Sequence, residues 1–345
     1  MDIVVLCGGL SAERDVSIAS GTMAAAALNR CGHRVVLADL FFGYTEDYEN
    51  PKEIFEREYD FTTAQVSEDV PDLDALRREK PDGSRIGRNI PEICRAADIV
   101  FMALHGEDGE DGKIQALFDL MGIKYTGTGP LGSQLAMNKS VAKQLFVQNN
   151  INTPRDVLLR RRVEPYGSIG FPCVVKPCSG GSSVGTHIVT QQDDYDAAVA
   201  DAFKYDEYVL SEQYIKGREL TVGVIAGKAM PVGEICPKSG FFDYKNKYQS
   251  GLTEEVFPAD IPTALTQTLQ NMAEQVYDIL KFDVYGRMDF IVDEHGKAWC
   301  MEGNTLPGLT PTSLLPKAAA AAGISYDELC EIIVRESLKK YEASI

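Results

Sequence analysis

Strand-like apolar runs alternate with helical segments in the first third of the chain. The runs lie at 3–7, 34–40 and 98–104, and helical patterns follow over 17–31 and 113–122. This alternation predicts a parallel sheet flanked by helices. Residues 41–95 interrupt the alternation, because they are acidic, contain Pro and show weak periodicity. We expect an insertion there that is helical in part, around 71–79.

The remaining two thirds of the chain mix strand and helix patterns in a different order. Turn-forming residues at 126–130 predict a boundary, and one helix is expected over 132–150. A strand at 171–177 leads into a Gly/Ser loop at 179–186. Further strands are expected at 188–190 and 207–214, a hairpin at 219–235, and helices at 193–204, 263–282, 312–322 and 326–341. The pattern predicts an α/β fold, α+β in part, with two or three domains.

A second predicted hairpin near the C-terminus carries a group of polar side chains. Its strands are 286–292 and 297–303, joined by turn-forming residues at 293–296. Side chains alternate between the two faces of a strand, so one face should hold Arg287, Asp289, Glu302 and Asn304. Two carboxylates and an amide oxygen suit a hard cation such as Mg²⁺. Taken alone, an ion-paired solvent face is the commoner explanation, by roughly three to one.

The loop length also predicts a register for this hairpin. We expect Arg287 opposite Glu302, and Asp289 opposite Cys300. The reverse face should belong to the core, with Met288, Phe290, Val292, Trp299 and Met301.

The net charge of the chain excludes some classes of binding partner. The formal net charge is −17, which argues against nucleic acid and against an anionic membrane surface. The composition is otherwise that of a globular protein, with 44% hydrophobic and 25% charged residues. An anionic substrate must therefore be held by a local group of Lys and Arg.

Cysteine and histidine usage indicates a reducing compartment. The eight Cys form no CxxC pair and several lie in apolar runs, so neither disulfides nor a zinc site is expected. Only four His occur, too few for a multi-His metal centre. No signal peptide pattern or run of 18 apolar residues is present, and we expect a cytoplasmic protein.

Several loops carry candidate chemistry. The Gly/Ser loop 179–186 can bring backbone N–H groups close to phosphate oxygens, and Lys176 stands just before it. It is not a P-loop. Glu212 and Glu219, at a strand end and a strand start, could accept from adenine or ribose, or could be solvated acids. Residues 241–248, dense in Tyr, Phe and Lys, form a lid or an ordinary surface loop.

Three further loops follow predicted strands or precede helices. His105 follows the strand at 98–104, where ligand crevices of parallel sheets form. Glu13 stands near a helix start, which favours a carboxylate and could also meet a substrate ammonium. Gly308 can present a free backbone N–H, and Ser313 lies near a helix start, a common capping position that could also bind a substrate carboxylate.

These pieces, in this order, resemble the D-alanine–D-alanine ligase family of ATP-grasp carboxylate–amine ligases. The resemblance covers nearly the whole chain except about 41–95, and its segments are GGLSAERDVS, LHGEDGEDGKIQ, YTGTGPLGSQLAMNK, VVKPCSGGSSVGT, SEQYIKGREL, FFDYKNKY, GRMDFIV and EGNTLPGLTPTSLLP. Together these segments are highly specific. One departure is Gly180, which stands where some members have an acidic residue.

The resemblance implies a reaction in two steps. The γ-phosphate of ATP passes to the carboxylate of one D-alanine, and the amine of a second D-alanine then attacks the acylphosphate. Catalysis of this kind depends mainly on positioning and electrostatics. The implied product is D-alanyl-D-alanine for peptidoglycan precursor synthesis.

The resemblance also assigns roles residue by residue. The implied nucleotide-binding residues are Lys139, Lys176, Ser183, Glu212, Gln213, Ile215 and Glu219. The implied metal ligands are Asp289, Glu302 and Asn304. The implied catalytic residues are Glu13, Ser182, Tyr248, Arg287 and Gly308, where the first three form a hydrogen-bonded trio and the last two stabilise the oxyanion. The implied substrate contacts are His105, Lys247, Ser313 and Leu314.

The resemblance further implies the cofactors, partners and domains. ATP is expected with Mg²⁺ or Mn²⁺, as two ions, and a monovalent cation is possible. Partners are small molecules only, with no nucleic acid and no membrane, and the chain is expected to form a homodimer. The implied domains are a Rossmann-like domain at 1–127, a central ATP-grasp subdomain at 128–212 and a C-terminal subdomain at 213–345.

Three alternatives remain open. The second substrate could be D-serine or D-lactate, although the DYKNKY pattern of the lid resembles dipeptide-forming ligases. An ATP-grasp ligase for another amino acid would fit less well with the lid and with EGNTLPG. A nucleotide-binding protein without activity fits less well with the presence of Arg287, Lys176, Lys247 and the three implied metal ligands.

Overall fold

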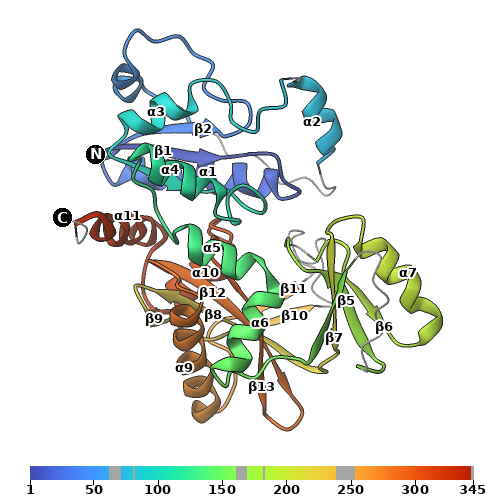
Figure 1. Ribbon diagram of the computed structural model, residues 1–345. Coiled ribbons are helices and arrows are strands. Elements are labelled where there is room, and N and C mark those ends of the chain that lie inside the picture. The colour runs from blue at the N-terminus through green and yellow to red at the C-terminus, as the bar shows by residue number, and fades with distance from the viewer. Residues whose placement is uncertain (62–70, 81, 161–168, 182, 238–252, 343–345) are drawn as a thin grey trace.

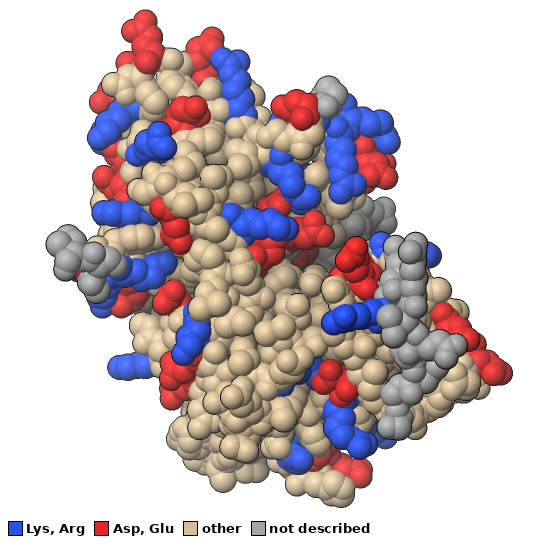
Figure 2. Space-filling model, in the orientation of Figure 1, with Lys and Arg blue, Asp and Glu red and all other residues tan. Residues whose placement is uncertain are grey.

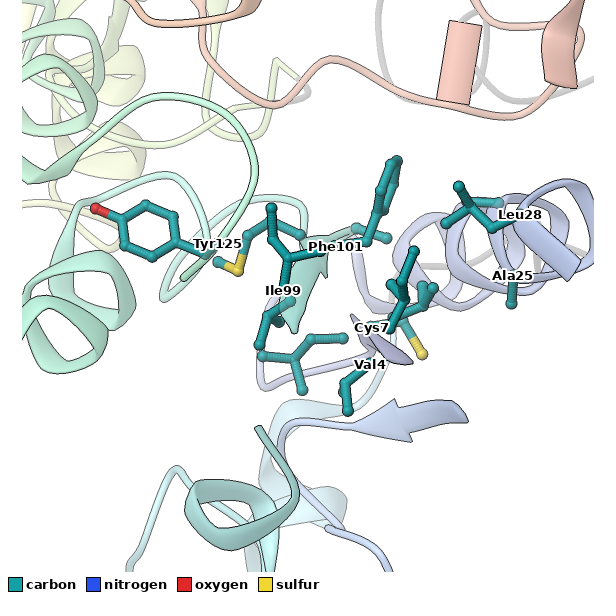
Figure 3. Close-up of a cluster of buried hydrophobic side chains, with 14 of the residues drawn as sticks. Val4, Cys7, Ala25, Leu28, Ile99, Phe101 and Tyr125 are labelled. Carbon is teal, nitrogen blue, oxygen red and sulfur yellow. The ribbon is translucent and has the colours of Figure 1, made fainter. Parts of the chain in front are cut away.

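Three sheets organise the computed structural model, which describes residues 1–61, 71–80, 82–160, 169–181, 183–237 and 253–342. The first sheet is parallel, in the order β2-β1-β3, as the apolar runs predict. Its strands are β1 (Asp2–Cys7), β2 (Arg34–Asp39) and β3 (Ile99–Met102), and its helices are α1 (Arg14–Arg30) and α4 (Lys113–Met121). Figure 3 shows how Val4, Ile99 and Phe101 from the sheet share a buried cluster with Ala25 and Leu28 from α1.

The insertion at 41–95 packs against this sheet more closely than its weak periodicity suggests. The expected helix is present as α2 (Leu73–Glu79). Two further elements, the 3-10 helix η1 (Pro51–Glu56) and α3 (Ile90–Ala96), were not predicted. Ile54 of η1 and Ile93 of α3 are fully buried in the core of the first sheet. A few apolar anchors in short helices hold the insertion, and such anchors give too little periodicity to detect.

The second sheet is antiparallel, in the order β4-β7-β5-β6. Its elements are β4 (Asp156–Arg160), β5 (Cys173–Pro177), β6 (His187–Val189), β7 (Tyr208–Gln213) and the covering helix α7 (Gln192–Ala202). The strands expected at 171–177, 188–190 and 207–214 are confirmed, whereas β4 was not predicted. Figure 1 shows this sheet and α7 as a separate small lobe.

The single helix expected over 132–150 is wrong. Two helices, α5 (Pro130–Met137) and α6 (Lys139–Gln148), meet at Asn138, whose backbone is extended. The Asn138 side chain accepts a hydrogen bond from the backbone N–H of Val141 at 3.1 Å and so caps α6. An Asn inside an apolar periodic pattern therefore marks a new helix start, because its short amide can satisfy a free N–H there.

Replacing this capping residue should weaken the fold. We expect Asn138→Ala to lower the free energy of unfolding by about 1 kcal/mol, because a backbone donor of α6 loses its acceptor. Asn138→Asp keeps an acceptor oxygen and should lose much less. Urea unfolding of the three proteins checks this, and equal losses in both variants would contradict the capping role.

The third sheet has six strands, in the order β11-β10-β8-β12-β13, with β9 paired to β8. Its strands are β8 (Gly217–Ile225), β9 (Lys228–Ala229), β10 (Gly233–Pro237), β11 (Thr253–Val256), β12 (Tyr285–Asp293) and β13 (Ala298–Asn304). Helix α9 (Thr263–Ile279) packs against it through a buried apolar face that includes Leu269, Ala273 and Val276. Both hairpins expected here are confirmed as antiparallel pairs.

The two C-terminal helices tie the first sheet to the rest of the molecule. Leu315 of α10 (Leu314–Ala321) and Ile333 of α11 (Tyr326–Glu342) belong to the same buried core as the first sheet. Helix α11 lies along α1 (Figure 1), and the Arg30 guanidinium donates two hydrogen bonds to Asp327 at 2.6 and 2.9 Å. Both helices lie within 213–345, the predicted C-terminal subdomain, yet they pack against the N-terminal sheet. The division of the chain into three domains stays a prediction.

Candidate active site

A cavity of about 500 Å³ lies between the second and third sheets. Strands β5, β6 and β7 line one side, and β8, β10, β12 and β13 line the other. All seven predicted nucleotide-binding residues line this cavity: Lys139, Lys176, Ser183, Glu212, Gln213, Ile215 and Glu219. Two predicted metal ligands, Asp289 and Glu302, line it as well. Its volume is typical of small-molecule sites.

Two lysines bring positive charge into this cavity of an acidic protein. Lys139, at the first turn of α6, donates to the carbonyl of Gly180 at 2.6 Å and lies 3.4 Å from Glu302. Lys176, in β5, donates to Glu212 Oε1 at 2.5 Å. Burial alone would lower the pKa of Lys176, but Glu212 and Glu302 outweigh it and the pKa is raised. Lys and Arg are otherwise interspersed with Asp and Glu over the face shown in Figure 2.

One buried lysine was missed by the sequence reasoning. Lys143 of α6 donates to Glu212 Oε2 at 2.8 Å and to Thr153 Oγ1 at 3.1 Å. Both carboxylate oxygens of Glu212 thus accept from ammonium groups, which lower its pKa although burial acts in the other direction. Lys143 follows Lys139 by one helical turn, so the helix pattern could have placed both on one face. The predicted contact of Glu212 with adenine stays a prediction.

The register predicted for the polar hairpin is wrong by two residues at Arg287 and Asp289, and by one residue beyond Asp289. Arg287 pairs with Asn304 and Asp289 pairs with Glu302, and a β-bulge then shifts the pairing so that Phe290 meets Cys300. At a β-bulge, two residues of one strand lie opposite one residue of its partner. The length of the turn predicts neither the presence nor the position of a bulge.

The bulge also changes the face of two residues that were expected in the core. Met301 lines the cavity, and Trp299 is half-buried, donating from its ring N–H to Asp293 at 2.9 Å. Cys300 and Ala298 take their places against the apolar core with Met288, Phe290 and Val292. The four polar side chains nevertheless remain on the opposite side of β12 and β13.

Asp289 is the centre of that polar group. Its carboxylate accepts two hydrogen bonds from Arg287, at 2.9 and 2.8 Å, and one from the amide nitrogen of Asn304 at 3.0 Å. The Thr221 hydroxyl on the neighbouring strand β8 donates a fourth, at 2.7 Å. The structure therefore gathers the predicted residues and also couples Arg287 directly to Asp289.

The donor set of the hairpin fits a magnesium ion. Asp289 and Glu302 stand directly opposite each other, so their carboxylates are within reach of one ion, and Asn304 adds an amide oxygen. Among the described residues no group of three or more His, Cys, Asp or Glu side chains could hold a metal. A site with only two carboxylates suits Mg²⁺, which takes further oxygens from phosphates.

Glu13, in the loop after β1, lies close to the backbone of Gly106 and to that of Gly181 in the Gly/Ser loop. A Cβ atom at Gly106 would stand 3.0 Å from Glu13 Oε2, and one at Gly181 would stand 3.1 Å away. The Glu13 carboxylate therefore joins the first sheet to the Gly/Ser loop of the second. The predicted partners Ser182 and Tyr248 lie outside the described residues, as do the predicted substrate contact Lys247 and the lid at 241–248.

His105 is buried beside this junction and makes two hydrogen bonds within the protein. Its Nδ1 donates to the carbonyl of Leu306 at 2.9 Å, and its Nε2 accepts from the Ser20 hydroxyl at 2.9 Å. The Ser20 oxygen in turn accepts from the backbone N–H of Leu309 at 3.3 Å. His105 thus fixes the 304–309 loop to α1, and its predicted contact with the first substrate stays a prediction.

We expect protonation of His105 to destabilise the fold. Burial lowers its pKa, with Glu13 acting in the other direction, so the unfolded chain takes up a proton near its ordinary pKa of 6.5 while the folded chain stays neutral. Stability is therefore present above that pH and is lost as the pH falls, by up to about 1.4 kcal/mol per unit.

Urea unfolding at about pH 7.5 and pH 5.5 measures this slope. The slope should be smaller in His105→Asn and unchanged in His295→Asn, since His295 is exposed in the β12–β13 turn. A slope in His105→Asn equal to that of the unmodified protein would contradict the assignment.

The loop before α10 brings three predicted residues together. A Cβ atom at Gly308 would stand 2.9 Å from Ser313 Oγ, so a larger residue here would require the Ser313 hydroxyl to move. Ser313 is the residue just before α10, but its hydroxyl bonds to Thr310 rather than capping the helix. Leu314 is buried against Ile235, a cavity-lining residue of β10.

One further carboxyl near Arg287 was not predicted. Burial raises the pKa of Glu110 well above its ordinary value, and the neighbouring Glu13 raises it further. Arg287 acts in the opposite direction. The HGEDGEDG segment thus supplies a second titratable group, Glu110, beside Glu13. The sequence reasoning singled out only His105 in this segment.

Two antiparallel sheets that enclose a lysine-bearing cavity, beside an N-terminal parallel sheet, define the ATP-grasp class of ligases. The chain matches the family described as D-ala D-ala ligase N-terminus over residues 2–128, and that described as D-ala D-ala ligase C-terminus over residues 143–335. It is 41% identical to the D-alanine–D-alanine ligase of Lacticaseibacillus casei strain BL23, over 99% of this chain and 97% of the relative. The chain belongs to the D-alanine–D-alanine ligase family.

Solved structures agree over the full length. The D-alanine–D-alanine ligase from Bacillus anthracis complexed with ATP superposes with a TM-score of 0.77 at 31% identity, covering 100% of this chain and 99% of that one. The VanG D-Ala:D-Ser ligase from Enterococcus faecalis superposes with a TM-score of 0.75 at 26% identity, covering 97% and 98%. Both confirm the predicted fold class.

Proposed function

We propose that the chain joins two D-alanine molecules into D-alanyl-D-alanine, with cleavage of ATP to ADP and phosphate, for peptidoglycan precursor synthesis. The observation that carries this is the cavity between the two antiparallel sheets. It collects all seven residues assigned to the nucleotide and opens onto Asp289 and Glu302. Phosphoryl transfer to a carboxylate needs such a collection of fixed charges.

The lysines and the Gly/Ser loop support the first step. Lys139 and Lys176 supply positive charge at the phosphates, and Gly180, Gly181 and Ser183 line the same cavity. Glu13 holds the ammonium of the first D-alanine at the junction of the first and second sheets. With its ammonium bound there, the substrate carboxylate is directed toward the γ-phosphate.

Arg287 and Gly308 support the second step. The Arg287 fork is held rigid by Asp289 at 2.8–2.9 Å, so it can stabilise the oxyanion of the tetrahedral intermediate without reorganising. The backbone N–H of Gly308 is a second donor. Ser313 and Lys247 bind the carboxylate of the second D-alanine, with Leu314 packed nearby.

We assign Mg²⁺, or Mn²⁺, as two ions to the polar hairpin. Asp289, Glu302 and Asn304 would hold them, and the ions would supply positive charge that offsets the charge of the ATP phosphates. Arg287 orients the Asp289 carboxylate by its paired hydrogen bonds. Transfer of the γ-phosphate then depends on Asp289 and Glu302, which the pairing of β12 with β13 holds opposite each other.

A homodimer in the cytoplasm completes the proposal. The eight Cys form no CxxC pair, which is typical of a reducing compartment and supports that location. Within the described part of the chain, no helix has the length and apolar character needed to cross a membrane. Sedimentation velocity tests the dimer: a monomer mass at micromolar concentration would overturn it.

ADP release tests the activity and its acceptor. With ATP, Mg²⁺ and D-alanine alone, we expect rapid ADP release, since D-alanine serves as both substrates. The similarity to the VanG D-Ala:D-Ser ligase makes D-serine the second candidate acceptor. No ADP with D-alanine alone, but release after D-serine or D-lactate is added, would reassign the second substrate.

A further inference from the structure

A buried ammonium group stands behind the cavity and reaches it only through other side chains. The Lys143 side chain is 2% exposed, and its Nζ lies 2.8 Å from Glu212 Oε2. On the cavity side, Lys176 donates to the other oxygen of the same carboxylate at 2.5 Å. Lys143 therefore lies behind Glu212, and both Glu212 and Lys176 line the cavity.

Lys143 is held in this position by residues from another strand. Its Nζ donates to Thr153 Oγ1 at 3.1 Å and lies 3.8 Å from Asp156 Oδ1, at the start of β4. Helix α6 and strands β4, β5 and β7 thus converge on one buried carboxylate. Burying charges is costly unless each is paired, so the arrangement depends on four charged side chains: Lys143, Asp156, Lys176 and Glu212.

The sharing of Glu212 decides how strongly Lys176 is bound. With Lys143 present, the negative charge of Glu212 is divided between two ammonium groups. Without Lys143, the whole charge would fall on Lys176. A phosphate entering the cavity would then compete with a stronger internal partner, in a pocket that has lost one positive charge.

We propose that Lys143 is a positioning residue for nucleotide binding. It shares the charge of Glu212 and so leaves Lys176 able to donate to a phosphate oxygen. This inference rests on the proposed function, which assigns Lys176 to the phosphates of ATP. Lys143 itself touches no substrate and acts through Glu212.

The test is a double-mutant cycle in the full-length chain. Lys143→Met should raise KM for ATP about tenfold in the native background, with KM for D-alanine and kcat little changed. In the Glu212→Gln background the same substitution should raise KM for ATP much less, because no Glu212 charge remains to be shared and only the lost positive charge acts. Lys228→Met, on the exposed strand β9, is the control and should have no effect.

Two further variants keep the outcomes distinct. If Lys143→Met does not fold, Thr153→Val decides, since it removes a hydrogen bond to Lys143 and should raise KM for ATP severalfold. Lys176→Met should raise KM for ATP in any case; if it does not, the proposed role of Lys176 fails. Suppose that Lys176→Met raises KM for ATP. If Lys143→Met then leaves KM for ATP unchanged, or raises it equally in the native and Glu212→Gln backgrounds, the positioning role of Lys143 is overturned and the proposed function stands.

Discussion

Replacing Glu302 by Gln is expected to lower kcat for ADP formation by about 100- to 1,000-fold. Glu302 pairs directly with Asp289 across the hairpin and lies 3.4 Å from Lys139, so its charge contributes both to the proposed metal site and to the orientation of a phosphate-binding lysine. Gln has the same shape but carries no negative charge. Initial rates at saturating D-alanine, with Mg²⁺ varied, measure the effect.

Glu294→Gln is the matched control for this substitution. Glu294 lies in the turn of the same hairpin, with a side chain that is 84% exposed, and its replacement should leave kcat unchanged. The Glu302→Gln variant should also require a higher Mg²⁺ concentration for half-maximal rate. Turnover within a few-fold of the unmodified protein would show that Glu302 is no metal ligand.

Replacing Arg287 by Lys is expected to lower kcat by about 100-fold while KM for ATP changes little. Arg287 makes two parallel hydrogen bonds to Asp289, and a single ammonium cannot reproduce that fork. The lost donor acts on the oxyanion that forms after ATP is bound, so the effect should fall on kcat rather than on nucleotide affinity.

Arg335→Lys provides the control, because Arg335 is exposed on α11 and pairs only loosely with Glu336 at 3.4 Å. Its replacement should leave both constants unchanged. A rise in KM for ATP with an unchanged kcat in Arg287→Lys would place Arg287 in nucleotide binding, and the oxyanion assignment would then be wrong.

Local patterns predicted most of the elements that surround the site. The period of two in 286–292 and 297–303 identified β12 and β13, and the position of Lys176 at a strand end was correct. These features depend on neighbouring residues only. The α/β class followed from the same patterns, because a parallel sheet needs helices between its strands.

The errors have physical causes that lie outside local pattern. The bulge beside Phe290 depends on packing between β12 and its two neighbours, and a single strand carries no sign of it. The break at Asn138 depends on a side chain competing for a backbone N–H. The position of α11 on the first sheet depends on contacts between residues about 300 positions apart, such as Arg30 and Asp327.

The roles of the site residues came from the resemblance rather than from pattern. Glu212 shows the difference: its sequence position suggested a solvated acid, whereas the structure buries it between Lys143 and Lys176. No periodicity distinguishes these two environments. The pairing of Arg287 with Asp289 was equally invisible, although both residues were correctly placed on one face.

Product identification tests the central claim most directly. The protein is incubated with ATP, Mg²⁺ and equal concentrations of D-alanine, D-serine and D-lactate, and the products are resolved by mass spectrometry. We predict D-alanyl-D-alanine as the main product, formed in equal amount with ADP, and formed about 100- to 1,000-fold more slowly by the Glu302→Gln variant. A main product of D-alanyl-D-serine or D-alanyl-D-lactate, or ADP formation with no D-alanine-containing product, would contradict the account.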